Sequence, residues 1–134
     1  MTSSIRRSTR IATVIGLGSA LALSSAPAQA KDLEVRRSGT CSASATWKLK
    51  AKAEGSRIEV ELEIDSNVNG QAWNIAVRDQ RVVVHTGTYR TAAPSGSFEA
   101  RRLIANRPGS DTITAVAIHP ASGQRCNAAL TFPG

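Results

Sequence analysis

The side chains that could do chemistry in this 134-residue chain are few and scattered. It has two cysteines, Cys41 and Cys126, and two histidines, His85 and His119. Catalysis needs a nucleophile beside a base, a pair of carboxylates or a metal cage. His85 stands near the end of an alternating segment, His119 precedes a proline, and no serine lies in a Gly-x-Ser-x-Gly turn. We therefore expect a protein that is not an enzyme, with no catalytic residue, no metal and no cofactor.

The two cysteines are interpreted as a disulfide. A metal pair is the alternative, but two sulfurs make an incomplete zinc site and no histidine stands at ligand spacing. A reactive thiol is a second alternative. In an exported chain, two cysteines near the two ends of one domain are most simply bridged. A Cys41–Cys126 bridge would close a loop of roughly 86 residues and stabilise the fold by about 4–5 kcal/mol in the chain-entropy model.

One short motif could bind a cation. Asp65-x-Asn67-x-Asn69-Gly70 matches the first half of a calcium-binding loop. Ala76 stands where the bidentate glutamate should follow, and a predicted strand precedes the loop in place of a helix. A turn is the simpler interpretation, because Asn-Gly readily takes positive φ. Calcium binding by residues 65–70 stays open at this point.

Residues 1–30 are typical of a signal peptide. Three arginines precede an apolar run at 11–23 that is too short for a bilayer, which needs about 20 residues. Ser8-Thr9-Arg10 after Arg6-Arg7 lacks the apolar pair of a twin-arginine signal, so Sec export is favoured. An uncleaved signal anchor is the alternative. We expect a secreted, extracellular protein that does not stay inserted in a membrane.

The expected cleavage site is the small-x-small motif ending at Ala28 and Ala30, with the mature chain starting at Lys31. Loss of three arginines leaves 14 basic and 10 acidic residues, so the net charge falls from +7 to +4. The basic residues are scattered and are not massed on one segment. A nucleic-acid site would need a clustered stripe with available aromatics, so we expect no nucleic-acid partner.

The alternation of apolar and polar residues over 41–65 predicts a β-hairpin. A two-residue turn at Glu54-Gly55 would place Lys50 opposite Glu59. The same register places Lys48 opposite Glu61 and Trp47 opposite Leu62. The side chains expected to face inward are Cys41, Ala43, Ala45, Trp47, Leu49, Ala51, Ile58, Val60, Leu62 and Ile64.

A second hairpin is expected over 73–86, with a turn at Asp79-Gln80. This turn would pair Val77 with Val82 and Ile75 with Val84, and would turn Val82, Val84 and Thr86 inward. Three more alternating segments follow: 98–104, 111–118 and 124–132. A phase shift at Arg101-Arg102 suggests a bulge. These two arginines could grip an anion, or they could be the exposed side of a bent strand.

The seven segments predict an all-β, antiparallel, immunoglobulin-like sandwich over 41–134, preceded by a flexible arm or short edge segment at 31–40. Trp73 on the third segment resembles the core tryptophan of such domains. The cysteines depart from the antibody pattern, because they join the first and last segments.

Two stretches, 35–75 and 96–126, resemble small exported proteins of actinobacteria. They read VRRSGTCSASATWKLKAKAEGSRIEVELEIDSNVNGQAWNI and GSFEARRLIANRPGSDTITAVAIHPASGQRC. This resemblance covers nearly the whole mature chain and implies the fold and the compartment. It implies no activity, ligand or site.

The candidate recognition loop lies within residues 86–97, where alternation stops and turn residues gather. Tyr89 and Arg90 could anchor a contact and Pro94 could stiffen the loop. A plain connection between two sheets is the alternative. We expect a secreted binding module that uses loops or a sheet face, with an extracellular protein or a cell-envelope polymer as its partner. A protease inhibitor that presents residues 86–97 around Arg90, or a cell-surface accessory protein, are the other candidates.

Overall fold

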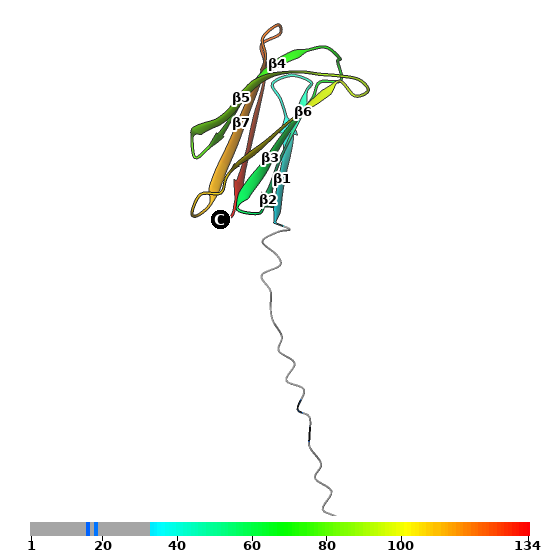
Figure 1. The fold of residues 1–134 in the computed structure, drawn as a ribbon. Coiled ribbons are helices and arrows are strands. Elements are labelled where there is room, and N and C mark those ends of the chain that lie inside the picture. Colours follow the sequence, from blue (N-terminus) through cyan, green and yellow to red (C-terminus); the bar gives the residue numbers. More distant parts are fainter. Residues whose placement is uncertain (1–15, 17, 19–32) are drawn as a thin grey trace, which may run out of the picture.

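Two four-stranded antiparallel sheets pack face to face in the computed structural model, which describes Gly16, Gly18 and residues 33–134 (Figure 1). The sheet orders are β1-β2-β3-β6 and β5-β4-β7-β8. Apart from Gly16 and Gly18, the predicted signal peptide over 1–30 and its predicted cleavage site at Ala28, Ala30 and Lys31 lie outside the described residues. The strands are β1 (Glu34–Thr40), β2 (Thr46–Glu54), β3 (Arg57–Asp65), β4 (Ala72–Asp79), β5 (Val82–Arg90), β6 (Ser97–Ala105), β7 (Asp111–His119) and β8 (Gln124–Phe132).

The described residues form eight strands and no helix, so the predicted all-β, antiparallel class is confirmed and the count of seven is wrong. The additional strand is β1, which lies in the 31–40 segment and pairs with β2 from Glu34↔Lys52 to Thr40↔Thr46. None of its residues is fully buried. An edge strand at the rim of a sandwich buries little side-chain area, so its sequence carries weak apolar alternation.

The first hairpin forms, but its predicted register is wrong. The turn is Gly55-Ser56, and Glu54 pairs with Arg57. Gly55 has a φ of 59°, a conformation that glycine adopts without steric cost. Moving the turn by one residue moves each partner by two positions. The apolar side chains therefore still share one face, and Leu49 lies opposite Leu62 in the core.

The second hairpin also turns one residue later than predicted, at Gln80-Arg81. Both residues have positive φ, 49° and 69°. A bulge between Val77 and Arg78 then shifts the pairing, so that Val77 lies opposite His85. The bulge reverses the predicted faces of β5 beyond Val84. His85, Gly87 and Tyr89 face the interior and Thr86 faces outward, in contrast to the prediction. Val84 packs against the core as predicted, and Val82 lies opposite the buried Asp79.

The bulge expected at Arg101-Arg102 is absent, and β6 pairs with β3 without interruption. Arg101 and Arg102 consequently point to opposite faces of the sheet and do not act as a pair. The apparent phase shift has a simple cause. Leu103 lies on the outer face, where it is 45% exposed, while Ile104 is buried.

Trp73 in β4 is the largest fully buried side chain, with 0% exposure. Its ring stacks on His119 with centroids 5.3 Å apart, and its Nε1 donates to Gln71 Oε1 at 3.3 Å. Its predicted place in the core is confirmed. The core contains 21 buried side chains from strands of both sheets and the loop before β2, with apolar residues alternating along β2, β3, β4, β7 and β8.

The Cys41–Cys126 disulfide is confirmed, with an S–S distance of 1.98 Å. Cys126 lies in β8, whereas Cys41 lies in the loop between β1 and β2, because β2 begins only at Thr46. The bridge therefore joins the two sheets at one side of the sandwich. Hydrogen bonds flank it: Ser42 N donates to Arg125 O at 2.8 Å, and Arg125 N donates to Ser42 Oγ at 2.9 Å.

Gly39 in β1 lies opposite Trp47 in β2, and the indole of Trp47 covers the glycine. A Cβ atom at position 39 would meet this ring at 2.7 Å. We expect Gly39→Val to displace the indole and lower the free energy of unfolding by about 1–3 kcal/mol. Denaturant unfolding followed by tryptophan fluorescence measures both effects. Ser38→Val at the neighbouring outward position is the control, and an equal loss in both variants would contradict the role of the Gly39–Trp47 contact.

Candidate functional site

The histidines of the chain make local contacts in the structure. His85 Nε2 lies 2.8 Å from Tyr89 Oη, and His119 Nδ1 lies 2.7 Å from Ser122 Oγ. Within Gly16, Gly18 and 33–134, no three His, Cys, Asp or Glu side chains gather in an arrangement that could hold a metal ion. In the same residues no helix is long and apolar enough to cross a membrane.

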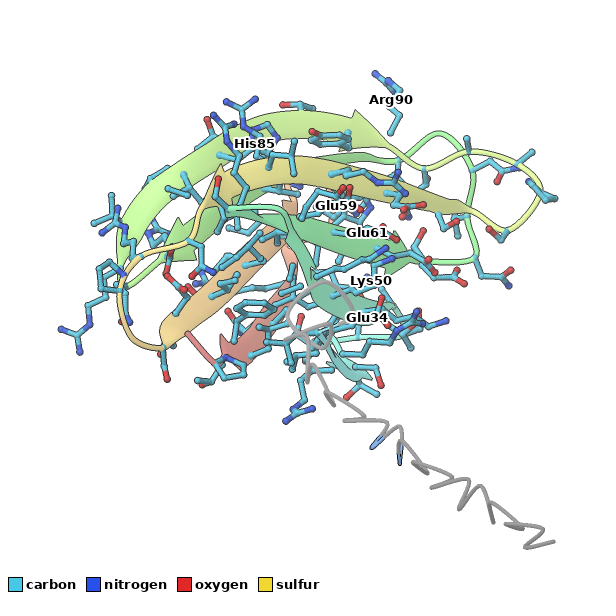
Figure 2. The ribbon with its side chains drawn as sticks, turned by 60° about the horizontal axis from the view of Figure 1, so that its bottom comes forward. Glu34, Lys50, Glu59, Glu61, His85 and Arg90 are labelled. Carbon is cyan, nitrogen blue, oxygen red and sulfur yellow. A yellow bond between two sulfur atoms is a disulfide. The ribbon has the colours of Figure 1, made fainter. Side chains whose placement is uncertain are left out.

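The structure does not bring the three predicted recognition residues together. Thr86–Arg90 belong to β5, so the predicted 86–97 loop is reduced to residues 91–96. Tyr89 faces inward and stacks on Phe98 with ring centroids 5.4 Å apart. Arg90 points to the opposite face, where its Nη1 donates to Gly70 O at 3.0 Å (Figure 2). Pro94 is exposed in the short turn that follows.

The segment with the partial calcium motif is a tight turn. Asp65 Oδ1 accepts a hydrogen bond from Asn67 N at 2.9 Å, and Asn67 has a φ of 59°. Thr91 Oγ1 donates to Val68 O. Gly96 lies directly against this turn, since a Cβ atom there would collide with the backbone of Asn67 and Val68. The Asp65 carboxylate therefore closes the turn and helps to pack it against residues 91–96.

The outer face of the β1-β2-β3-β6 sheet, which we call the charged face, carries six basic and seven acidic residues. Lys50 Nζ lies 3.1 Å from Glu61 Oε2, and Arg101 Nη2 lies 3.1 Å from the same oxygen. Figure 2 shows Glu34, Lys50, Glu61 and Glu59 along this network. The residues of the charged face are Glu34, Arg36, Ser38, Thr40, Thr46, Lys48, Lys50, Lys52, Glu54, Arg57, Glu59, Glu61, Glu63, Asp65, Ser97, Glu99, Arg101, Leu103 and Ala105.

The ion pairs on the charged face change the pKa values of its carboxyls. A hydrogen bond from Arg36 lowers the pKa of Glu34. Partial burial acts to raise the pKa of Glu61, but hydrogen bonds with Glu99 and Lys50 outweigh it, and the pKa is lowered. The hydrogen bond to Glu61 raises the pKa of Glu99. A shallow depression of about 600 Å³ over β1, β2 and β3 is lined by both signs of charge. The basic and acidic side chains of the charged face therefore largely neutralise one another.

The outer face of the β5-β4-β7-β8 sheet has a different composition, and we call it the arginine-rimmed face. Its charged residues are Arg78, Arg90 and Arg125, and it carries no lysine, aspartate or glutamate. None of the three arginines takes part in an ion pair with the described residues. Its uncharged residues are Ala72, Asn74, Ala76, Val83, Thr86, Thr88, Thr112, Thr114, Val116, Ile118, Asn127, Ala129 and Thr131.

Two aspartates are fully buried at the end of the sandwich that holds the β4–β5 turn and the β6–β7 loop. Asp79 closes β4 with 1% exposure, and Asp111 opens β7 with 0% exposure. Both oxygens of Asp79 and Oδ1 of Asp111 have no hydrogen-bond partner. The predicted turn at Asp79-Gln80 would have exposed Asp79, so sequence reasoning missed this pair. The available signal was the alternation itself, since Asp79 follows Ile75 and Val77 in phase.

In comparisons with known proteins, no family model, no curated protein and no solved structure matches this chain.

Proposed function

We propose that the chain is a secreted, non-catalytic binding module with an immunoglobulin-like sandwich, which docks a protein partner on its arginine-rimmed face. The strand order supports the immunoglobulin-like assignment. Without the edge strand β1, seven strands remain, in the orders β2-β3-β6 and β5-β4-β7-β8. These correspond to strands A-B-E and C′-C-F-G of an immunoglobulin-type sandwich.

The composition of the arginine-rimmed face is the observation that carries the proposal. The buried centres of protein interfaces are depleted of lysine, aspartate and glutamate and enriched in arginine. The middle of the arginine-rimmed face lacks lysine, aspartate and glutamate, and its arginines stand at the edges, whereas the charged face of the same molecule is rich in lysine and glutamate. Val116 and Ile118 in the central strand β7 are only half-buried, because no described element covers them. The protein thus has one face suited to water and one suited to a partner.

The charge of this face indicates the chemistry of the partner. Three arginines without a carboxylate favour a surface with acidic residues at matching positions. Arg90 and Arg125 lie on the edge strands β5 and β8, and Arg78 lies at the far end of β4. Uncharged side chains separate them. A polyanion needs a continuous basic track, so this spacing favours an acidic protein surface over a cell-envelope polymer or a nucleic acid.

Binding through the arginine-rimmed face can be tested with one variant on this face and a matched control variant on the charged face. Val116→Glu places a carboxylate in the middle of the arginine-rimmed face, where burial against a partner would leave it unpaired. Ser38→Glu adds the same charge to the charged face. Proteins captured from culture supernatant and cell envelope by the wild type are measured against both variants by titration. We expect Val116→Glu to weaken binding at least about 10-fold, or about 1.4 kcal/mol, and Ser38→Glu to leave it unchanged.

The arginines need a separate control, because a change of charge alone alters nonspecific adsorption. Arg125→Glu and Lys52→Glu change the net charge equally, on opposite faces. Equal losses in these two variants would mean that net charge and not the arginine-rimmed face drives capture. Retention of a purified envelope polymer, with no protein bound, would contradict the proposed partner class.

A further inference from the structure

The buried pair Asp79 and Asp111 lies in a position that the proposed binding face does not use. Both side chains point into the sandwich at the start of the β4–β5 turn and the end of the β6–β7 loop. Gln80 N, next to Asp79, donates to Thr112 O at 3.0 Å, so the two strand ends are held together by backbone as well. A buried carboxylate that lacks a hydrogen bond is costly, and two of them side by side are more so.

Few charged groups act on this pair. Arg107 in the β6–β7 loop places its Nε 4.0 Å from Asp79 Oδ2, and it is the one cation paired with either aspartate among the described residues. The Asn106 amide can donate to Asp111 Oδ2 at 3.1 Å once its nitrogen faces the carboxylate. One long contact to a guanidinium that is 44% exposed does not neutralise two buried anions. A proton held between the two carboxyls would neutralise one charge and satisfy an unpaired oxygen.

We propose that Asp79 and Asp111 share a proton in the folded protein and form a pH-sensitive lock at this end of the β5-β4-β7-β8 sheet. The lock holds the end of β4, the start of β7 and the loop that carries Arg107. When the shared proton leaves, two buried negative charges repel one another across the strand ends. The β6–β7 loop, on which the C-terminal Gly134 is seated, is the segment that relieves this repulsion by opening.

The direction of the pH dependence follows from proton linkage. Burial, followed by the close approach and the charge of the Asp111 carboxyl, raises the pKa of Asp79 to about 6, against the opposing effect of Arg107. A group whose pKa is raised by folding binds more protons in the folded state. Its stabilising effect is complete below the ordinary value of 3.8 and is lost as the pH rises through about 6. The lock therefore weakens between mildly acidic and neutral conditions.

Asp79→Asn tests the lock, because an asparagine imitates the protonated acid at every pH. The disulfide-bonded protein and the variant are unfolded with denaturant across the pH range. We expect the unfolding equilibrium constant of the wild type, relative to Asp79→Asn, to rise about 60-fold between pH 4 and pH 7. Glu63→Gln, which removes a carboxylate from the charged face, is the control and should run parallel to the wild type.

Carboxyl NMR of the wild-type protein measures the titration midpoint of Asp79 directly. This measurement does not require that a variant folds. A titration midpoint of Asp79 near pH 6 supports the lock, and a midpoint near pH 4 overturns it. A constant ratio between wild type and Asp79→Asn across the pH range overturns it as well. If calcium restores the stability of the wild type at neutral pH but not that of Asp79→Asn, the pair holds a cation in place of a proton, and the proposal is wrong.

Discussion

Replacement of both cysteines by alanine is expected to lower the free energy of unfolding by about 4–5 kcal/mol. The bridge spans 85 residues, so its removal restores a large part of the conformational freedom of the unfolded chain. Cys126 is also 1% exposed, and the loss of its sulfur leaves a small gap beneath β8. Guanidinium unfolding of wild type and Cys41→Ala/Cys126→Ala at neutral pH gives the difference, and the reduced wild type should behave like the double variant.

The hydrogen bonds beside the bridge have to be separated from the bridge itself. Ser42→Ala removes the hydroxyl that accepts from Arg125 N and keeps the disulfide. This variant should lose about 1 kcal/mol, the usual contribution of one hydrogen bond. A double cysteine variant that loses no more than Ser42→Ala would show that the covalent link adds nothing to the packing around it.

Trp73→Ala is expected to cost about 3–5 kcal/mol, the range for removal of a large aromatic side chain from a core. The ring has 0% exposure, stacks on His119 and lies between the two sheets, so the cavity cannot collapse without movement of both. Urea unfolding measures the loss. Trp47→Ala provides the matched comparison, because Trp47 covers Gly39 at the rim and is only half-buried. Equal losses for the two tryptophans would contradict the central position of Trp73.

The alternation of the sequence was sufficient to predict the sandwich class and most of the core. Leu49, Val60, Ile113 and Leu130 face inward as their phase requires. The hairpin registers were wrong because alternation only tests whether apolar side chains share a face. A shift of each partner by two positions keeps the apolar side chains on the same face, so alternation cannot distinguish the two registers.

In the second hairpin, the sequence did not indicate the position of the turn or the presence of the bulge. Gln80 and Arg81 adopt positive φ, although neither residue type favours it. A turn of this kind is usually predicted from an Asn-Gly pair, which is absent here. The residue types around the bulge at Val77 do not predict the bulge either. These two features decide that Tyr89 faces the core and that Asp79 ends a strand. The recognition residues and the buried acid pair could not be placed without them.

The arginine-rimmed face could be predicted from the sequence only in part. Alternation indicates which residues of each strand point outward, but the order of the strands in the sheet decides which of these residues become neighbours. Arg78, Arg90 and Arg125 lie far apart in the chain, and only the β5-β4-β7-β8 order gathers them on one surface. A net charge of +4 for the expected mature chain gives no indication that one sheet is balanced while the other has no carboxylate.

The position of the disulfide makes the two long sides of the sandwich mechanically unequal. On one side the β1–β2 loop is tied covalently to β8. On the other side β5 faces β6 through side-chain contacts such as the stacking of Tyr89 on Phe98, and residues 91–96 join the end of β5 to the start of β6. The backbone therefore holds that side at one end of the two strands only, whereas reduction of the disulfide would remove the covalent link on the opposite side.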